Sequence, residues 1–80
     1  MTVSEAVVKR LFELIQARNL TINMLSTISG VTQSTVNDFM NGTTSNVKIG
    51  TIKKLCDGLN ISVRQFFDSP LFDDLEQELK

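Results

Sequence analysis

The sequence predicts an all-α domain of five short helices, and it leaves room for a short sixth helix at the C-terminus. Apolar residues recur three and four positions apart along most of the chain and almost never alternate at a period of two. Two capping boxes, Thr2 with Glu5 and Ser62 with Gln65, mark helix N-termini. With 80 residues, 41% hydrophobic and 21% charged, the chain has the composition of one small globular domain.

The first helix is expected over residues 3–18. It begins after the Thr2 capping box and ends with Arg18, a cation that suits the negative end of the helix dipole. The residues of this helix that are expected to face the core are Val7, Leu11, Leu14 and Ile15.

Two shorter helices are expected next, over residues 22–29 and 33–41. Thr21 and Thr32 are their N-caps, and Gly30 stands in the turn between them, where a positive φ favours glycine. Asn41-Gly42 closes the third helix, and a polar loop follows over 43–46. The residues expected to face the core are Leu25, Ile28, Val36, Phe39 and Met40.

The fourth helix is expected to start between 48 and 51 and to end at 58, with a weakly marked start because Gly50 is a poor helix former. The fifth helix opens at the Ser62 capping box and runs through Phe67. The residues expected to face the core are Ile49, Ile52, Leu55, Cys56, Leu59, Val63, Phe66 and Phe67. Cys56 is therefore expected to be a buried core residue, not a reactive thiol.

Residues 68–80 are interpreted as an acidic amphipathic tail that follows a domain over residues 1–67. The tail carries five acids against one lysine, a balance of −4, whereas residues 1–67 carry seven Lys/Arg against four Asp/Glu, a balance of +3. Ser69 followed by Pro70 predicts a helix start. The apolar stripe of this helix is Leu71, Phe72, Leu75 and Leu79. Such a stripe must pack on its own domain or on a second copy, and we expect the tail to help form a homodimer.

The composition excludes most enzymes and metal sites. With no histidine and one cysteine, the chain lacks the usual zinc sites, Ser-His-Asp triads and Cys-His pairs. We therefore expect no catalytic residue, no metal, no cofactor and no small-molecule ligand. No apolar run approaches the roughly 18 residues of a membrane span, and a lone cysteine fits a reducing compartment. The expected localisation is the cytoplasm, without membrane attachment.

The most distinctive pattern lies between Thr21 and Gly42. Leu25 and Ser26 precede Gly30, and Val-Thr-Gln-Ser at 31–34 opens the next helix. Further along, Ile-Lys-Lys-Leu-Cys at 52–56 precedes Leu-Asn-Ile-Ser at 59–62. Together these elements, with Val36, resemble the phage-repressor-type (lambda-repressor-like, or XRE) helix-turn-helix family over roughly residues 3–67. The resemblance implies a compact five-helix domain, bacterial or phage-encoded, whose third helix enters the DNA major groove.

The resemblance and the side-chain chemistry together assign a role in DNA binding to ten residues. The expected base-reading residues are Gln33, Ser34, Thr35, Asn37 and Asp38, since glutamine can bond to adenine and aspartate to cytosine. The expected phosphate contacts are Thr21, Asn23, Thr32, Asn41 and Lys48. The alternative stays open that these are the ordinary polar residues of an exposed helix and a solvated loop lysine.

Three features depart from the family's pattern. Ile22 stands where relatives often carry a phosphate-binding glutamine, so neighbouring hydroxyls and helix amides are expected to supply that contact. Ile15 and Met40 stand where many relatives carry an ion pair, and an apolar contact is expected there. Val47 stands where relatives often carry proline.

The leading hypothesis is a repressor-like transcriptional regulator that binds double-stranded DNA sequence-specifically, as a homodimer, with helix 33–41 in the major groove. The alternative is a protein-interaction module, such as an antitoxin-like or adaptor protein, that uses the same helical fold. The acidic tail favours the alternative, whereas the polar third helix and Lys48 oppose it. An enzyme is the third and weakest hypothesis.

Overall fold

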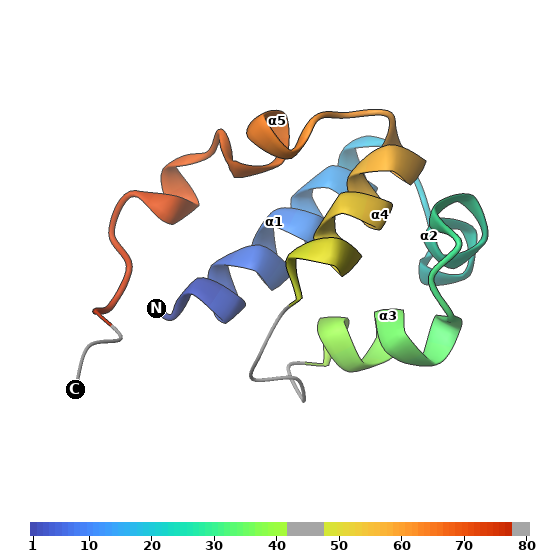
Figure 1. Ribbon diagram of the computed structural model, residues 1–80, viewed down its shortest axis with the longest axis horizontal. Helices are drawn as coiled ribbons and strands as arrows, with labels where there is room; N and C mark the ends of the chain where they lie inside the picture. The colour runs from blue at the N-terminus through green and yellow to red at the C-terminus, as the bar shows by residue number, and fades with distance from the viewer. Residues whose placement is uncertain (42–47, 78–80) are drawn as a thin grey trace.

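The computed structural model describes residues 1–41 and 48–77. In these ranges the chain forms five α-helices and a final 3₁₀ helix (Figure 1). The elements are α1 (Val3–Ala17), α2 (Ile22–Ser29), α3 (Gln33–Met40), α4 (Ile49–Leu59), α5 (Val63–Phe67) and η1 (Pro70–Phe72). The all-α prediction is confirmed, and the five main helices begin and end within one residue of the expected bounds where these were given. None of the helices in the described ranges is long and apolar enough to cross a membrane.

The helix ends follow the capping residues in the sequence. The Thr2 hydroxyl accepts from the Glu5 amide at 3.2 Å, and the Glu5 carboxylate accepts from the Thr2 amide at 2.9 Å. The same reciprocal pair joins Ser62 and Gln65. At the other end of α1, Arg18 is the C-cap, and its guanidinium donates to the Leu14 carbonyl at 3.5 Å. Both predicted capping boxes and the C-terminal role of Arg18 are confirmed.

A single hydrophobic core joins all five helices. Its buried members are Val7, Leu11, Leu14, Ile15, Leu25, Val31, Val36, Phe39, Met40, Ile52, Leu55, Cys56, Leu59 and Phe66. Ile15 and Met40 are both buried in this cluster, as the apolar replacement of an ion pair requires; a direct contact between them stays a prediction. The residues over 42–47, including the expected polar loop and Val47, lie outside the described ranges.

Two residues expected in the core are exposed instead. Ile28 is 46% exposed, and the atoms that approach Gly58 of α4 most closely are backbone atoms of Ile28 and Ser29. Ile49 is 64% exposed because it is the first residue of α4 and lies about one turn before Ile52, past the edge of the core. Helical spacing predicted the correct stripe but extended it too far on both helices.

The acidic tail packs on its own domain, and its predicted α-helix is wrong for residues 73–77. Helix η1 is a single 3₁₀ turn that Ser69 caps, and adjacent aspartates at 73 and 74 oppose its continuation, since aspartate is a weak helix former. The Phe72 ring meets Phe67 edge-on, with centroids 4.9 Å apart, and the Glu76 amide donates to the Met1 carbonyl at 3.1 Å. Leu79 lies outside the described residues. A role for this tail in a dimer stays a prediction.

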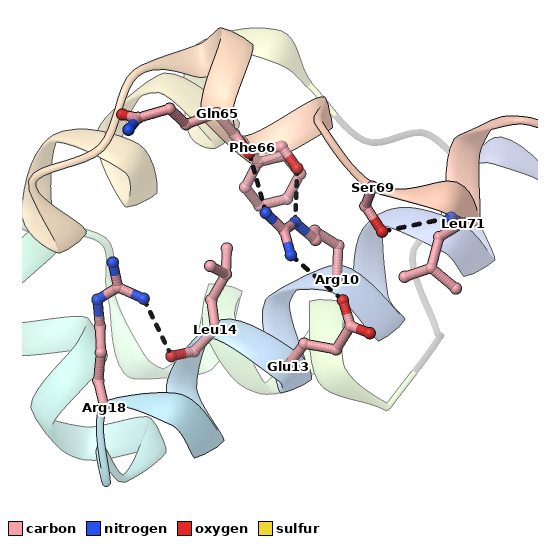
Figure 2. Close-up of polar contacts among 8 residues, drawn as sticks. All are labelled: Arg10, Glu13, Leu14, Arg18, Gln65, Phe66, Ser69 and Leu71. Atoms are coloured by element: carbon pink, nitrogen blue, oxygen red, sulfur yellow. Dashed lines mark hydrogen bonds and ion pairs between the residues drawn. The ribbon is translucent and has the colours of Figure 1, made fainter.

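Arg10 joins α1 to α5 through two carbonyl groups (Figure 2). Its Nε donates to the Phe66 carbonyl at 2.7 Å and its Nη2 to the Gln65 carbonyl at 2.9 Å. Glu13 holds the same guanidinium at 3.4 Å from the solvent side. Because α5 has only five residues, the Arg10 Nε supplies a partner to the Phe66 carbonyl at its end, and Nη2 adds a second donor to the Gln65 carbonyl, which also accepts from the Asp68 amide.

Gly58 brings α4 into backbone contact with the end of α2. A Cβ atom at this position would lie 2.8 Å from the Ser29 Cα and 2.9 Å from the Ser29 N and the Ile28 O. These are backbone atoms, so they cannot move aside by rotating a side chain. Without a shift of α2 or α4, only glycine fits at this contact between the two helices.

Replacing Arg10 by methionine keeps much of its length but removes both donors. We expect Arg10→Met to lower the free energy of unfolding by about 1–3 kcal/mol, because the partly buried bond to the Phe66 carbonyl and the exposed bond to the Gln65 carbonyl both lose their charged donor. Glu13→Gln is the matched control and should change it by under about 0.5 kcal/mol, since the Arg10–Glu13 pair is exposed. Urea unfolding followed by circular dichroism measures both, and equal losses would contradict the role of Arg10.

The two glycines of α4 allow a comparison within one helix. Gly58→Ala is expected to destabilise by about 1–3 kcal/mol, because the added methyl overpacks a backbone contact. Gly50→Ala meets open space and should stabilise by about 0.5–1 kcal/mol through helix propensity. Thermal unfolding should move in opposite directions for the two variants, and a shift of the same sign would contradict the close approach at Gly58.

Candidate nucleic-acid interface

A glycine turn joins α2 and α3 at a sharp angle. Gly30 has φ 72° and ψ 13°, a left-handed conformation that glycine adopts without steric cost, and its amide donates to the Ser26 carbonyl at 3.1 Å. Val31 follows with its side chain buried in the core, and Thr32 then caps α3. The turn is thus fixed at one end by backbone geometry and at the other by burial.

Two serines tie this turn together. The Ser26 hydroxyl donates to the Val31 carbonyl at 2.6 Å, across the turn from α2 to the start of α3. The Ser29 hydroxyl donates to the Leu25 carbonyl at 2.6 Å and accepts from the Val31 amide at 3.4 Å. Neither serine was expected from the sequence to have a structural role. The signal was present, because serine near a helix end commonly bonds to nearby backbone groups.

The N-terminus of each helix in the pair carries a threonine cap. Thr21 Oγ1 accepts from the Met24 amide at 3.1 Å, and Thr32 Oγ1 accepts from the Thr35 amide at 3.3 Å. The Thr32 hydroxyl also shares a hydrogen bond with the Thr35 hydroxyl at 2.8 Å. A helix N-terminus with exposed amides and a hydroxyl cap attracts anions such as phosphate oxygens. Both threonines expected to contact phosphate therefore stand where such a contact is chemically favourable.

Helix α3 presents a polar face to solvent. Ser34 and Asp38 are four residues apart, so they share one face of the helix, away from the buried Val36, Phe39 and Met40. Gln33 and Thr35 are also exposed, whereas Asn37 is half-buried. Four of the five residues expected to read bases are thus accessible to a large ligand, and Asn37 is the least accessible.

The other expected phosphate contacts lie at element ends. Asn23 is exposed in the first turn of α2, and Asn41 is the exposed C-cap of α3. Lys48 is exposed at the N-cap position of α4, where its side chain makes no capping hydrogen bond. Figure 1 shows α3 at the lower right of the molecule, with α5 along the top and the C-terminal segment at the left.

The helix pair is almost uncharged. Between Arg18 and Lys48 the sequence holds one ionisable side chain, Asp38. A polyanion approaching this surface would meet hydroxyls, amides and the positive ends of two helices, together with the ammonium group of Lys48. Hydrogen bonding, more than ion pairing, is therefore what this surface offers to a ligand.

Among the described residues, Cys56 and the acidic side chains show no arrangement typical of a reactive thiol or a metal site. Cys56 is fully buried, and its burial raises the pKa of the thiol, which keeps it neutral and unreactive. In the ranges 1–41 and 48–77, no group of three or more potential ligand side chains is arranged to hold a metal ion.

Comparison with known proteins agrees with this arrangement. The family described as the Cro/C1-type HTH DNA-binding domain matches residues 10–70. The solved structure titled "Crystal structure of the prophage Lp1 protein 11" is 44% identical and has a TM-score of 0.79, covering 92% of this chain and 97% of that chain. No curated protein matches the chain in sequence. The family match runs from α1 to the start of η1 and includes the whole of α2, the glycine turn and α3. The chain therefore belongs to the Cro/C1-type helix-turn-helix DNA-binding domain family.

Proposed function

We propose that this protein is a repressor-like transcriptional regulator that reads double-stranded DNA sequence-specifically by placing α3 in the major groove. The observation that carries the proposal is the exposed polar face of α3, which the serine-bonded turn holds at a fixed angle to α2. An α-helix fits the major groove of B-DNA, and side chains such as Gln33, Ser34 and Asp38 can bond to base edges there.

Phosphate contacts would position this helix. We assign them to Thr21, Asn23, Thr32, Asn41 and Lys48, with help from the amides at the starts of α2 and α3. Most of these groups are neutral, so few counterions are released on binding, and the affinity should depend weakly on salt for a DNA-binding domain. Lys48 is the exception, because a lysine on a phosphate releases about one counterion.

A homodimer completes the proposal. A single domain of 80 residues reads only a few base pairs, and two copies related by a two-fold axis would read two half-sites about 34 Å apart. Residues 1–67 would supply the DNA-binding unit in each copy, and residues 68–80 would lie outside it. We also expect the protein to act in the cytoplasm of a bacterium.

A protein-interaction module is the second candidate. Met24 and Ile28 are both nearly half exposed on one side of α2, which an interface with another protein would cover. Selection of binding sites from a pool of random duplexes distinguishes the two candidate functions. A recovered consensus supports the regulator, whereas recovery of random sequences alone would contradict sequence-specific binding.

Removing one base-reading residue and one phosphate contact should have different effects. We expect Gln33→Ala to weaken binding to the selected site by about 1–3 kcal/mol and to leave random duplex unaffected. Lys48→Ala should weaken binding to both kinds of duplex equally and reduce the slope of log K against log salt by about one. Fluorescence anisotropy over a salt series measures both quantities.

Arg64→Ala is the matched control for charge. Arg64 is exposed on α5, which lies on the side of the molecule away from α3 (Figure 1). This variant loses the same unit of charge as Lys48→Ala, and we expect its salt slope to remain close to that of the unmodified chain. A slope change as large as that of Lys48→Ala would mean that net charge, not a local contact, sets the salt dependence.

Half-site spacing tests the homodimer. If two copies bind a two-fold site, inserting about five base pairs between the half-sites turns them to opposite faces of the duplex and should abolish cooperative binding. Inserting about ten base pairs returns both half-sites to the same face of the duplex and should restore part of the cooperative binding. Sedimentation of the protein–DNA complex gives the stoichiometry, and one chain per selected site would contradict the dimer.

A further inference from the structure

The contact at Gly58 connects two parts of the proposed DNA-binding surface. Gly58 lies near the C-terminal end of α4 and meets the backbone of Ser29, the last residue of α2. In Figure 1, the two helices lie at the right of the molecule, and α2 packs more extensively on α4 than any other pair of described helices packs. A contact between backbone atoms on both sides leaves little freedom in the distance between the helices.

Ser29 couples the position of the end of α2 to the position of α3. Its hydroxyl bonds to the Leu25 carbonyl and the Val31 amide, and Ser26 bonds to the Val31 carbonyl. The end of α2, the turn and the start of α3 therefore form one hydrogen-bonded unit. A displacement of Ser29 would move the start of α3 with it.

Helix α4 carries Lys48 at its other end. Lys48 precedes the first residue of this 11-residue helix. A helix this short moves largely as one body, so a shift at Gly58 also moves the end that carries Lys48. Gly58 thus sits where α4, which positions Lys48, meets the unit that positions α3. The space at this position therefore bears on how far the N-terminal end of α4, which carries Lys48, lies from α3.

We propose that Gly58 is a positioning residue for DNA binding, because it sets the distance between Lys48 and the α2–turn–α3 unit so that both can engage one duplex. This inference rests on the proposed function and extends it to a residue that would not touch DNA. A methyl group at 2.8 Å must retreat to an ordinary contact of at least 3.4 Å, so the helices must separate by roughly 0.6 Å. Hydrogen bonds weaken over such displacements, so Lys48 and α3 could not both keep their best geometry.

The test compares Gly58→Ala with an equally disruptive change elsewhere. Phe66→Leu removes volume from the core at α5 and adds no atom at the contact between the Gly58 and Ser29 backbones, so it should lower the melting temperature without forcing α2 and α4 apart. Both variants are assayed on the selected duplex at a temperature where circular dichroism shows them folded. We expect Gly58→Ala to lose about tenfold in affinity and about one unit of salt slope, whereas Phe66→Leu keeps both values.

A double-mutant cycle with Lys48→Ala then tests whether Gly58→Ala weakens binding through Lys48. If Gly58→Ala acts by displacing Lys48 from a phosphate, adding it to Lys48→Ala should cause no further loss of salt slope. Additive losses of slope would overturn the inference, and so would unchanged affinity and slope in Gly58→Ala alone. If Gly58→Ala does not fold, the cycle is run in the Gly50→Ala background, with that variant as reference, because its added helix propensity offsets part of the loss.

The outcomes of these experiments distinguish a failure of the positioning role from a failure of the proposed function. An unmodified chain that selects no duplex overturns the proposed function, and the positioning role falls with it. An unmodified chain that binds a selected site while Gly58→Ala binds it equally well overturns the positioning role alone.

Discussion

Four of the five α-helices in the described residues are too short to be stable by themselves, so the fold depends on one shared core. Isolated helices below about 12–15 residues are marginal in water, and α2, α3 and α5 have eight, eight and five residues. Leu11, Leu25 and Phe66, from three different helices, are fully buried together in that core. The pair α2 and α3 can present polar side chains to solvent on one face only because the apolar residues on its other face are buried in this core.

Features that depend on neighbouring residues in the chain were predictable from the sequence. The caps at Thr2, Thr21, Thr32 and Ser62 and the turn at Gly30 are local, because each is satisfied by groups within a few residues. Family resemblance then placed the candidate interface, and the structure shows Gln33, Ser34 and Asp38 exposed, as a base-reading role requires.

Features that depend on distant residues were not predictable. Helical periodicity assigned Ile28 and Ile49 to the core, but it cannot say where the neighbouring helix ends or whether backbone fills the contact. For the same reason the sequence did not predict the role of Arg10, whose hydrogen-bond partners are 55 and 56 residues away. It also did not predict the role of Gly58, which depends on its close contact with the backbone of α2. The tail was predicted as an α-helix because its stripe suited one, yet ring contacts with Phe66 and Phe67 are satisfied by a single 3₁₀ turn.

The contact between Met1 and Glu76 brings the N-terminal end of the fold close to the last described part of the tail. The Glu76 amide donates to the Met1 carbonyl at 3.1 Å, and both segments lie at the left of Figure 1, whereas α3 lies at the lower right. A short linker could therefore join these ends into a circularly permuted chain without crossing the helix pair. By the same geometry, a domain or label fused at the N-terminus would extend from the side remote from α3 and leave its polar face uncovered.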